Sequence, residues 1–319
     1  MTPLQGSVIG AMEGSPLVAL DRLTGALGLE GRILAKLDYL LPGFSKKDRA
    51  ARRIIEDALA AGDLAPGQVV VELTSGNMGT GLAIVSAVLG HPFVAVMSAG
   101  NSAERARMMR ALGAEVVLVP QAPGSRPGEV SGADLDLVEE AAQAITIERR
   151  AFRADQFARS GNPAAHFDAT APEIWDQSGG AVTAFCDFVG SGGTLAGCAR
   201  FFALHGVRSY AVEPVGAAVL AGKAATTPDH PIQGGGYARA GLAHLEGITL
   251  AGHLAVTGDE ARDTARLLAR TEGIFAGFSS GANVAAAARL LAGPERGGVV
   301  AVVICDSGLK YLSTDLWAE

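Results

Sequence analysis

The sequence contains few of the residues that stabilise small disulfide-rich or metal-binding domains. Its 319 residues include three cysteines, Cys186, Cys198 and Cys305, and none of these forms a CxxC pair. An odd number of cysteines without that spacing argues against a disulfide framework and against a zinc site. The pattern suits buried thiols in a reducing compartment, so we expect no metal site and a cytoplasmic location.

A basic surface and long hydrophobic runs are also missing. Charged residues make up 18% of the chain and the formal net charge is -7, so the positive field that attracts nucleic acid or anionic membranes is absent. Glycine and charged residues interrupt the apolar stretches before they reach the length of a membrane span. The N-terminal stretch MTPLQGSVIGAMEGSPLVAL lacks the features of a secretory signal. We therefore expect neither a nucleic-acid nor a membrane partner.

The sequence does contain a regular alternation of short apolar runs and longer alanine-rich helical patterns. Apolar residues make up 49% of the chain, and the runs include VVVEL (69–73), FVAVMS (93–98) and GVVAVVICD (298–306). Strands that are almost wholly apolar and separated by helices indicate parallel sheets covered on both faces. The predicted fold is α/β with two doubly wound parallel-sheet domains, an N-terminal domain at residues 1–160 and a C-terminal domain at 161–319.

Three glycine-containing segments join an expected strand to an expected helix. FVGSGGTLAG (188–197) is the strongest, because its glycines permit close approach of a ligand and the free amides of the next helix attract an anion. ELTSGNMGTGLA (72–83) and FSSGANVAAA (278–287) also fit ordinary capped turns. The strongest segment fits a dinucleotide fold as well, since Glu213 follows Gly190 at close to the ~20-residue offset of a ribose-binding acid.

The segment LPGFSKKDRA (41–50) places two lysines at the expected N-terminus of a helix. That helix has a capping-box pattern at Ser45 and Asp48 and a stop signal at Gly62. An amine at a helix N-terminus has a lowered pKa, because the positive helix end and burial both disfavour the ammonium form. Such a lysine can form a Schiff base with an aldehyde. An aldehyde combined with a phosphate for the glycine loop points to pyridoxal 5′-phosphate as the cofactor.

Taken in order along nearly the whole chain, the motifs resemble those of fold-type II pyridoxal-phosphate enzymes of the cysteine synthase/cystathionine β-synthase family, which share the tryptophan synthase β-like fold. The resemblance implies a cofactor in the cleft between the two domains, an amino-acid substrate and a homodimer. Because AVEP belongs to the family pattern, Glu213 loses most of its weight as a ribose ligand. The matching segments are EGSPLVAL, PGFSKKDR, TSGNMG, DQFARSGNPAAHFDATAPEIW, GSGGTLAG, AVEP, EGIFAGFSSGANVAAA and CDSGLKYLST.

The resemblance also implies a role for each matching position. Lys47 would form the Schiff base and move the α-proton, and Asn77 would contact the 3′-oxygen of the cofactor. Ser307 would face the pyridine nitrogen, although a shift of one residue would place Asp306 there and reverse the consequence for ring protonation. The residues implied to bind the cofactor phosphate are Gly190, Ser191, Gly192, Gly193 and Thr194. Those implied to bind the substrate are Thr74, Ser75, Gly76, Met78 and Gln156.

The sequence departs from the family pattern at positions that affect substrate choice. Met78 replaces a threonine, and methionine cannot donate a hydrogen bond to the substrate carboxylate. Either the pocket takes a bulkier or more apolar β-substituent or partner, or Met78 turns away and a backbone amide holds the carboxylate. Ser98 replaces a proline, and Tyr237 is expected near the entrance. Lys46 replaces an apolar residue and is expected to face solvent.

The predicted reaction is β-replacement on an O-activated or 3-substituted L-amino acid through an aminoacrylate, as in cysteine synthases. The enzymatic alternative is β-elimination by a dehydratase or ammonia-lyase, which releases the aminoacrylate. A nicotinamide-dependent oxidoreductase is the alternative from another class, and it depends on the glycine spacing and Glu213 alone. An intact Lys47 argues against a catalytically silent binding module.

Overall fold

A computed structural model of the chain describes residues 4–74, 76–126, 128, 130–227 and 230–318. Its strands form two sheets, in the orders β1-β2-β10-β7-β8-β9 and β5-β4-β3-β6. Every neighbouring pair is parallel except β1 and β2. The larger sheet contains β1 (Leu17–Ala19), β2 (Arg32–Lys36), β7 (Ala184–Phe188), β8 (Arg208–Pro214), β9 (Gly252–Val256) and β10 (Val299–Val303). The smaller sheet contains β3 (Val70–Leu73), β4 (Phe93–Ser98), β5 (Glu115–Val119) and β6 (Phe152–Arg153).

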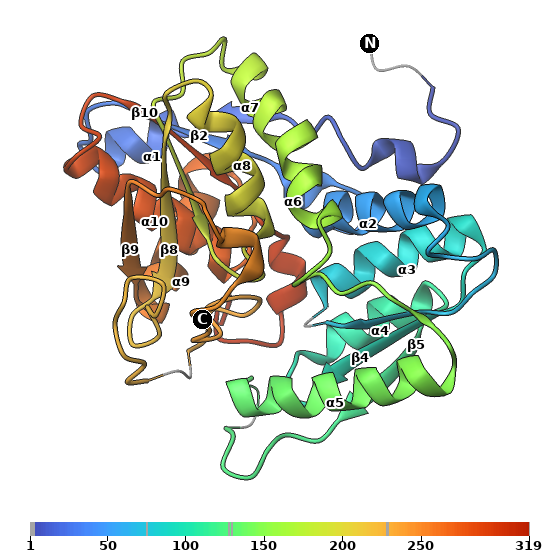
Figure 1. The fold of residues 1–319 in the computed structure, drawn as a ribbon. Coiled ribbons are helices and arrows are strands. Elements are labelled where there is room, and N and C mark those ends of the chain that lie inside the picture. Colours follow the sequence, from blue (N-terminus) through green and yellow to red (C-terminus); the bar gives the residue numbers. More distant parts are fainter. Residues whose placement is uncertain (1–3, 75, 127, 129, 228–229, 319) are drawn as a thin grey trace.

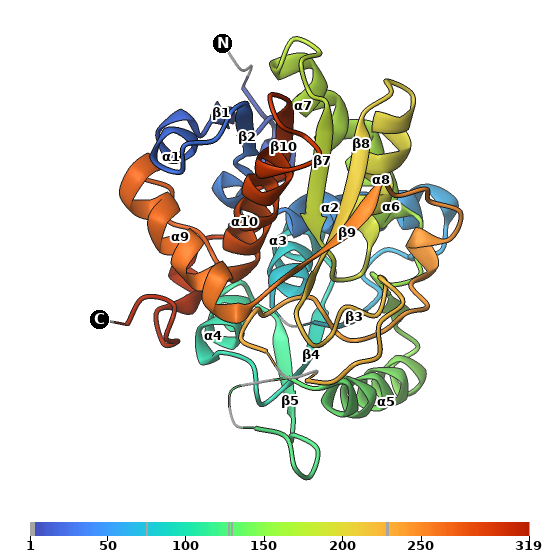
Figure 2. The same ribbon diagram turned by 90° about the vertical axis from the view of Figure 1, so that its left-hand side faces the viewer.

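Helices cover both faces of each sheet, so the expected α/β fold with two parallel-sheet units is confirmed (Figure 1). In the larger unit, α9 and α10 lie on one side of β7 and β8, and α7 and α8 lie on the other (Figure 2). In the smaller unit, α2, α3 and α4 pack on one face and α5 on the other. None of the helices within the described ranges combines the length and the apolar character needed to cross a membrane. The helices are α1 (Asp21–Ala26), α2 (Lys47–Ala61), α3 (Asn77–Leu89), α4 (Ala103–Ala111), α5 (Gly132–Glu148), α6 (Gly161–Ala165), α7 (Ala171–Gln177), α8 (Gly193–Ala203), α9 (Gly258–Glu272) and α10 (Phe278–Ala292).

The N-terminal strands β1 and β2 belong to the larger sheet, whose other strands come from the C-terminal half of the chain. β2 pairs with β10 along its full length, and β1 flanks β2 as the antiparallel edge strand. Ile33 faces the core beneath α9 and α10, whereas Leu34 faces the core beneath α7 and α8. An apolar strand of this kind needs cover on both faces, and the larger sheet provides it. The expected division at residue 160 therefore does not hold for the segment that carries β1 and β2.

The helix that carries the two lysines differs from expectation at its start and agrees at its end. α2 begins at Lys47, and no side chain caps its first turn. The Asp48 carboxylate accepts a hydrogen bond from the main-chain amide of Gly43 at 2.5 Å, so the expected capping box does not form. The helix ends at Gly62 in the left-handed conformation, with φ 76°. This start of α2 meets the loops that follow β3, β7 and β10, and in parallel sheets such carboxyl-end loops form the usual ligand site.

Candidate active site

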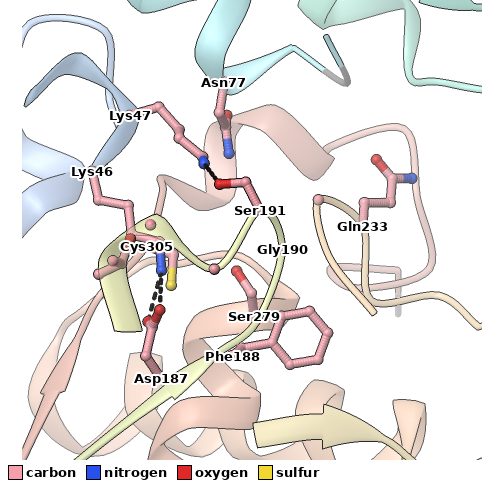
Figure 3. Close-up of a pocket in the computed structure, with 14 residues that line it drawn as sticks. Lys46, Lys47, Asn77, Asp187, Phe188, Gly190, Ser191, Gln233, Ser279 and Cys305 are labelled. Atoms are coloured by element: carbon pink, nitrogen blue, oxygen red, sulfur yellow. Dashed lines mark hydrogen bonds and ion pairs between the residues drawn. The ribbon is translucent and has the colours of Figure 1, made fainter. Parts of the chain in front are cut away.

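A pocket lies where the start of α2 meets the loops at the carboxyl ends of β3, β7 and β10 (Figure 3). The expected cofactor residues from both halves of the chain come together here, with the exception of Ser307. The lining residues are Lys46, Lys47, Asn77, Asp187, Phe188, Gly190, Ser191, Gly192, Gly193, Thr194, Gln233, Gly234, Ser279 and Cys305.

Lys47 points into the pocket without an ionic partner among the described residues. Its amine donates a hydrogen bond to the Ser191 hydroxyl at 3.2 Å, as Figure 3 shows. Burial lowers the pKa of this amine, and the positive charge of Lys46 lowers it further, to about 8. A large fraction of the amine is therefore neutral near pH 8, and a neutral amine is a nucleophile and a base.

Lys46 is not a surface residue, so the expectation that it faces solvent is wrong. Its amine lies 2.6 Å and 2.8 Å from the two carboxylate oxygens of Asp187. The residue is 8% exposed, and Asp187 is 2% exposed. Asp187 raises the pKa of Lys46 above its ordinary value despite the opposing effect of burial, so Lys46 stays protonated. The two adjacent lysines thus differ in charge within one pocket.

The segment Gly190–Thr194 forms an open cradle at the start of α8. Gly192 is left-handed, with φ 85°, and no side chain caps the helix that follows. A Cβ added at Gly190 would lie 2.6 Å from the carbonyl oxygen of Gly234, and one added at Gly193 would overlap the Asn162 amide. Main-chain amides free at a helix start, with two hydroxyls beside them and no side chain in the way, fit a phosphate. The residues present therefore fit the phosphate of the expected cofactor.

Asn77 is held in one orientation at the start of α3. Its carbonyl oxygen accepts a hydrogen bond from the Lys310 amine at 2.8 Å, and its amide nitrogen donates to Asp306 at 2.7 Å. Tyr311 donates to the same Asp306 oxygen at 2.7 Å, and Lys310 donates also to the carbonyl of Gly43 at 2.8 Å. Asp306 therefore orients Asn77. Its neighbour Ser307 does not line the pocket.

Ser279 lines the pocket and Ser307 does not, so the expected assignment of Ser307 is not supported. The Ser307 hydroxyl accepts a hydrogen bond from the amide of Leu309 at 3.3 Å, because it caps the short 3-10 helix Gly308–Tyr311. Ser279 lies in the first turn of α10 and lines the pocket floor (Figure 3). The sequence carried a signal for it, since FSSGANVAAA repeats the glycine-bounded opening of a helix.

Four of the residues expected to bind substrate, Thr74, Gly76, Met78 and Gln156, are not among the residues that line the pocket. Thr74 accepts hydrogen bonds from the amides of Gly76 and Gly79 at 3.0 Å and 2.8 Å, so its hydroxyl shapes the loop. Gln156 donates to the carbonyl of Leu73 at 3.3 Å. Ser75 lies outside the described residues. The role of this loop in holding the substrate stays a prediction.

Met78 turns away from the pocket. Its side chain is 2% exposed and belongs to the core beneath α2 and α3, together with Ile54 and Leu82. The interpretation in which Met78 selects a bulky substituent is therefore not supported. The alternative, in which a backbone amide holds the substrate carboxylate, agrees with this geometry.

Two charged residues lie where the sequence motifs did not indicate. Glu213 is outside the pocket and Asp187 is inside it. Glu213 accepts hydrogen bonds from the amides of Leu220 and Ala221 at 2.9 Å and 3.1 Å, and it does not line the pocket. Asp187 does line it, although no motif singled it out. The available signal was a lone carboxylate inside the otherwise apolar strand AFCDF.

Comparison with known proteins agrees with this geometry. The sequence model of the family described as "Pyridoxal-phosphate dependent enzyme" matches residues 8–306. The chain belongs to this family. Its cofactor is pyridoxal 5′-phosphate, as the sequence predicts, and the nicotinamide alternative is left without support.

Known relatives place this pyridoxal-phosphate-dependent enzyme near the cysteine synthases. It is 38% identical to cysteine synthase 3 of Caenorhabditis elegans over 98% of this chain and 89% of that protein. It is 38% identical to O-ureido-L-serine synthase of Streptomyces lavendulae over 99% of this chain and 93% of that protein. A crystal structure of cysteine synthase from Entamoeba histolytica is similar with a TM-score of 0.89 at 33% identity, over 99% of this chain and 91% of that chain. The expected resemblance to fold-type II cysteine synthases is confirmed.

Glu72, at the end of β3, gives a prediction about stability. Burial raises the pKa of this carboxyl to about 7, and Arg153 at 3.7 Å only partly opposes the effect. The folded-state pKa thus exceeds the unfolded value, so wild type loses stability as the pH rises from about 4.5 to about 7. We expect Glu72→Gln to remove that loss, which amounts to about 3 kcal/mol. Thermal unfolding at pH 5 and pH 8 should show a gain confined mainly to pH 8.

Glu115 provides the control, because it is an exposed glutamate whose pKa is lowered by a hydrogen bond from Arg149. Glu115→Gln should not stabilise the protein at pH 8. Equal effects of Glu72→Gln at both pH values would mean that Glu72 does not titrate between them.

Proposed function

We propose that the enzyme catalyses β-replacement on an O-activated L-amino acid, with Lys47 as its cofactor lysine. The observation that carries the proposal is a lysine amine without an ionic partner among the described residues, in the same pocket as the Gly190–Thr194 cradle. The names of the relatives support an O-activated serine as substrate, since both cysteine and O-ureidoserine are serine derivatives substituted at the β-carbon.

The groups of the chain have separate tasks in this reaction. Pyridoxal phosphate, when bound, stabilises negative charge at the α-carbon of an amino acid. The amides at the start of α8 and the hydroxyls of Ser191 and Thr194 hold the phosphate. Lys47 accepts the α-proton at Nζ, which the lowered pKa of its amine allows. Asn77, with its orientation fixed by Lys310 and Asp306, contacts the 3′-oxygen.

We place Ser279 opposite the pyridine nitrogen in place of Ser307. This assignment is supported by its position on the pocket floor, whereas the Ser307 hydroxyl is used as a helix cap. A serine hydroxyl does not force the ring to stay protonated as a carboxylate does. A hydroxyl at this position would therefore suit loss of the β-substituent better than transamination.

The substrate carboxylate is proposed to bind main-chain amides of the loop between β3 and α3. Thr74 fixes the shape of that loop, and the Met78 side chain is buried in the core, so a main-chain amide of the loop is left to hold the carboxylate. Gln156 lies against the same loop through its bond to Leu73. The enzyme is proposed to act as a homodimer, in line with the family, and in the cytoplasm, which suits the buried free thiols of its three cysteines.

The first test is chemical trapping of the cofactor. Borohydride reduction of the purified protein followed by peptide mapping should leave the pyridoxyl group on Lys47, because Lys46 is protonated and bound to Asp187. Lys47→Ala should abolish turnover yet preserve folding, since the side chain lies in a cleft. A label on Lys46, or no label, would contradict the assignment.

The phosphate cradle gives a second prediction. Gly192→Asp places a carboxylate beside the phosphate and a side chain at φ 85°, so cofactor content should fall strongly. Gly247→Asp is a matched control, because Gly247 is also left-handed and nothing lies within 4 Å of an added Cβ. Cofactor absorbance per protein would measure both variants. Equal cofactor content in the two would refute the cradle.

The reaction itself is tested with one electrophile and two nucleophiles. O-acetyl-L-serine with sulfide should yield cysteine, and with hydroxyurea it should yield O-ureidoserine if the hydroxyl of hydroxyurea is accepted. Mass spectrometry of the products distinguishes the two. Release of pyruvate and ammonia at the same rate with or without a nucleophile would instead identify a β-eliminating lyase.

A further inference from the structure

Two adjacent lysines enter one pocket and bind different partners. The Lys46 amine points to the carboxylate of Asp187 on the pocket floor, whereas the Lys47 amine points to the Ser191 hydroxyl (Figure 3). The side chains of Lys46 and Asp187 are 10% and 2% exposed. At such burial either charge alone would lack solvation, so the pair stays formed. The proposed function uses Lys47 and gives Lys46 no role.

Both members of this ion pair are fixed by further contacts. The Asn283 amide donates to Asp187 at 3.2 Å and to the carbonyl of Val303 at 2.9 Å. The side-chain oxygen of Asn283 accepts from the amide of Phe188 at 2.6 Å, which ties it to β7. The main-chain amide of Lys46 donates to the carbonyl of Cys305 at 2.9 Å. Asp187 cannot leave the pocket floor without losing its bond from Asn283, and the main-chain bond of Lys46 fixes the point from which its side chain extends.

A fixed cation disfavours a second positive charge beside it. The pKa of Lys47 falls to about 8 through burial first and the charge of Lys46 second, and Asp187 and Glu72 oppose the fall. Three more titratable groups face this part of the site. Burial raises the pKa of the Cys305 thiol to about 12, and it lowers the pKa values of His166 and His244, so all three stay neutral near pH 8.

We propose that Lys46, held by Asp187, is a positioning residue that places a fixed cation in the pocket of Lys47 and favours the uncharged form of the Lys47 amine. An unprotonated amine can form a C=N bond with the cofactor aldehyde, and its two protons then leave with the aldehyde oxygen as water. A protonated amine has no lone pair for this bond. The inference rests on the proposed function of Lys47, but the effect of Lys46 on the Lys47 amine exists without the cofactor.

The test measures the pKa of Lys47 directly. Full-length protein freed of cofactor is acetylated with trace acetic anhydride across a pH series, and the Lys47 peptide is quantified by mass spectrometry. The midpoint should lie near 8 in wild type. Lys46→Met should raise it by on the order of one pH unit, because the cation is lost whether Asp187 stays ionised or takes up a proton. Lys46→Arg keeps the cation and should keep the midpoint.

Lys36→Met separates this electrostatic role from simple loss of a buried ion pair. Lys36 is fully buried and pairs with Glu173 at 2.6 Å, outside the pocket. Its replacement should lower the thermal unfolding midpoint and leave the Lys47 titration unchanged. If Lys46→Met likewise loses stability without moving the Lys47 midpoint, Lys46 is merely structural and the inference is overturned.

A second variant covers the case in which Lys46→Met fails to fold. Lys46→Met with Asp187→Asn removes both charges and leaves no unpaired ion, and its Lys47 midpoint should rise by less than in Lys46→Met, because the opposing charge of Asp187 is lost as well. An unchanged midpoint in this folded variant overturns the inference. Pyridoxal-phosphate uptake, followed by absorbance on the same samples, tests the proposed function separately. A midpoint that moves in a protein that never binds the cofactor supports the role of Lys46 and refutes the proposed function.

Discussion

The first turn of α2 is bound to the main chain of the loop that follows β10, and the rest of the site depends on this attachment. The amide of Lys46 donates to the carbonyl of Cys305 at 2.9 Å, and the amide of Ser307 donates to the carbonyl of Phe44 at 3.1 Å. Phe44 adopts a left-handed backbone with φ 60°, which few residues other than glycine tolerate. This strained turn lies just before the two consecutive residues, Lys46 and Lys47, whose side chains line the pocket.

Consecutive residues at a helix start diverge by about 100° around the helix axis. One side chain can therefore reach the floor at Asp187 when the next reaches the cradle at Ser191. The following turn of α2 is fixed by Arg49, which is 2% exposed and bonds to both Asp38 and Glu173. α2 is thus attached to the loop after β2, to α7 and to the loop after β10. A helix held at three places presents its lysines in a preorganised arrangement.

Sequence patterns succeeded where the local chain determines the outcome. The strand–helix alternation depends on neighbours in the sequence, and the structure confirms it. Lys47 and the glycines at 190, 192 and 193 line one pocket, and their roles toward the cofactor stay a prediction. The failures involve contacts between distant segments. Lys46 meets a partner 141 positions away, and an adjacent pair of lysines gives no indication of which one will find a carboxylate. Ser279 and Ser307 follow equally plausible motifs, and only the packing of α10 against β7 decides which hydroxyl enters the pocket.

The position of Met78 illustrates the same limit. A residue in the first turn of a helix can face the ligand or the core, depending on the rotation of that helix. Here the Thr74 hydroxyl binds the amides of Gly76 and Gly79, and this cap fixes the rotation of α3. The cap directs Met78 into the core and Asn77 into the pocket. One hydrogen-bonded turn therefore determines a property that residue type alone leaves open.

The charges of the pocket lining explain why its two lysines have different tasks. Asp187 is paired with Lys46, and the Lys47 amine loses its charge as the pH rises through its pKa of about 8, so above that pH the lining offers little unpaired positive charge to a phosphate. The phosphate must then be held by the amides and the dipole at the start of α8, which need no side-chain cation. This arrangement leaves the Lys47 amine available for chemistry, because it is not required as a counter-ion. In the buried pair beside it, Asn283 donates a hydrogen bond to Asp187, which keeps this carboxylate with Lys46 when a phosphate lies nearby.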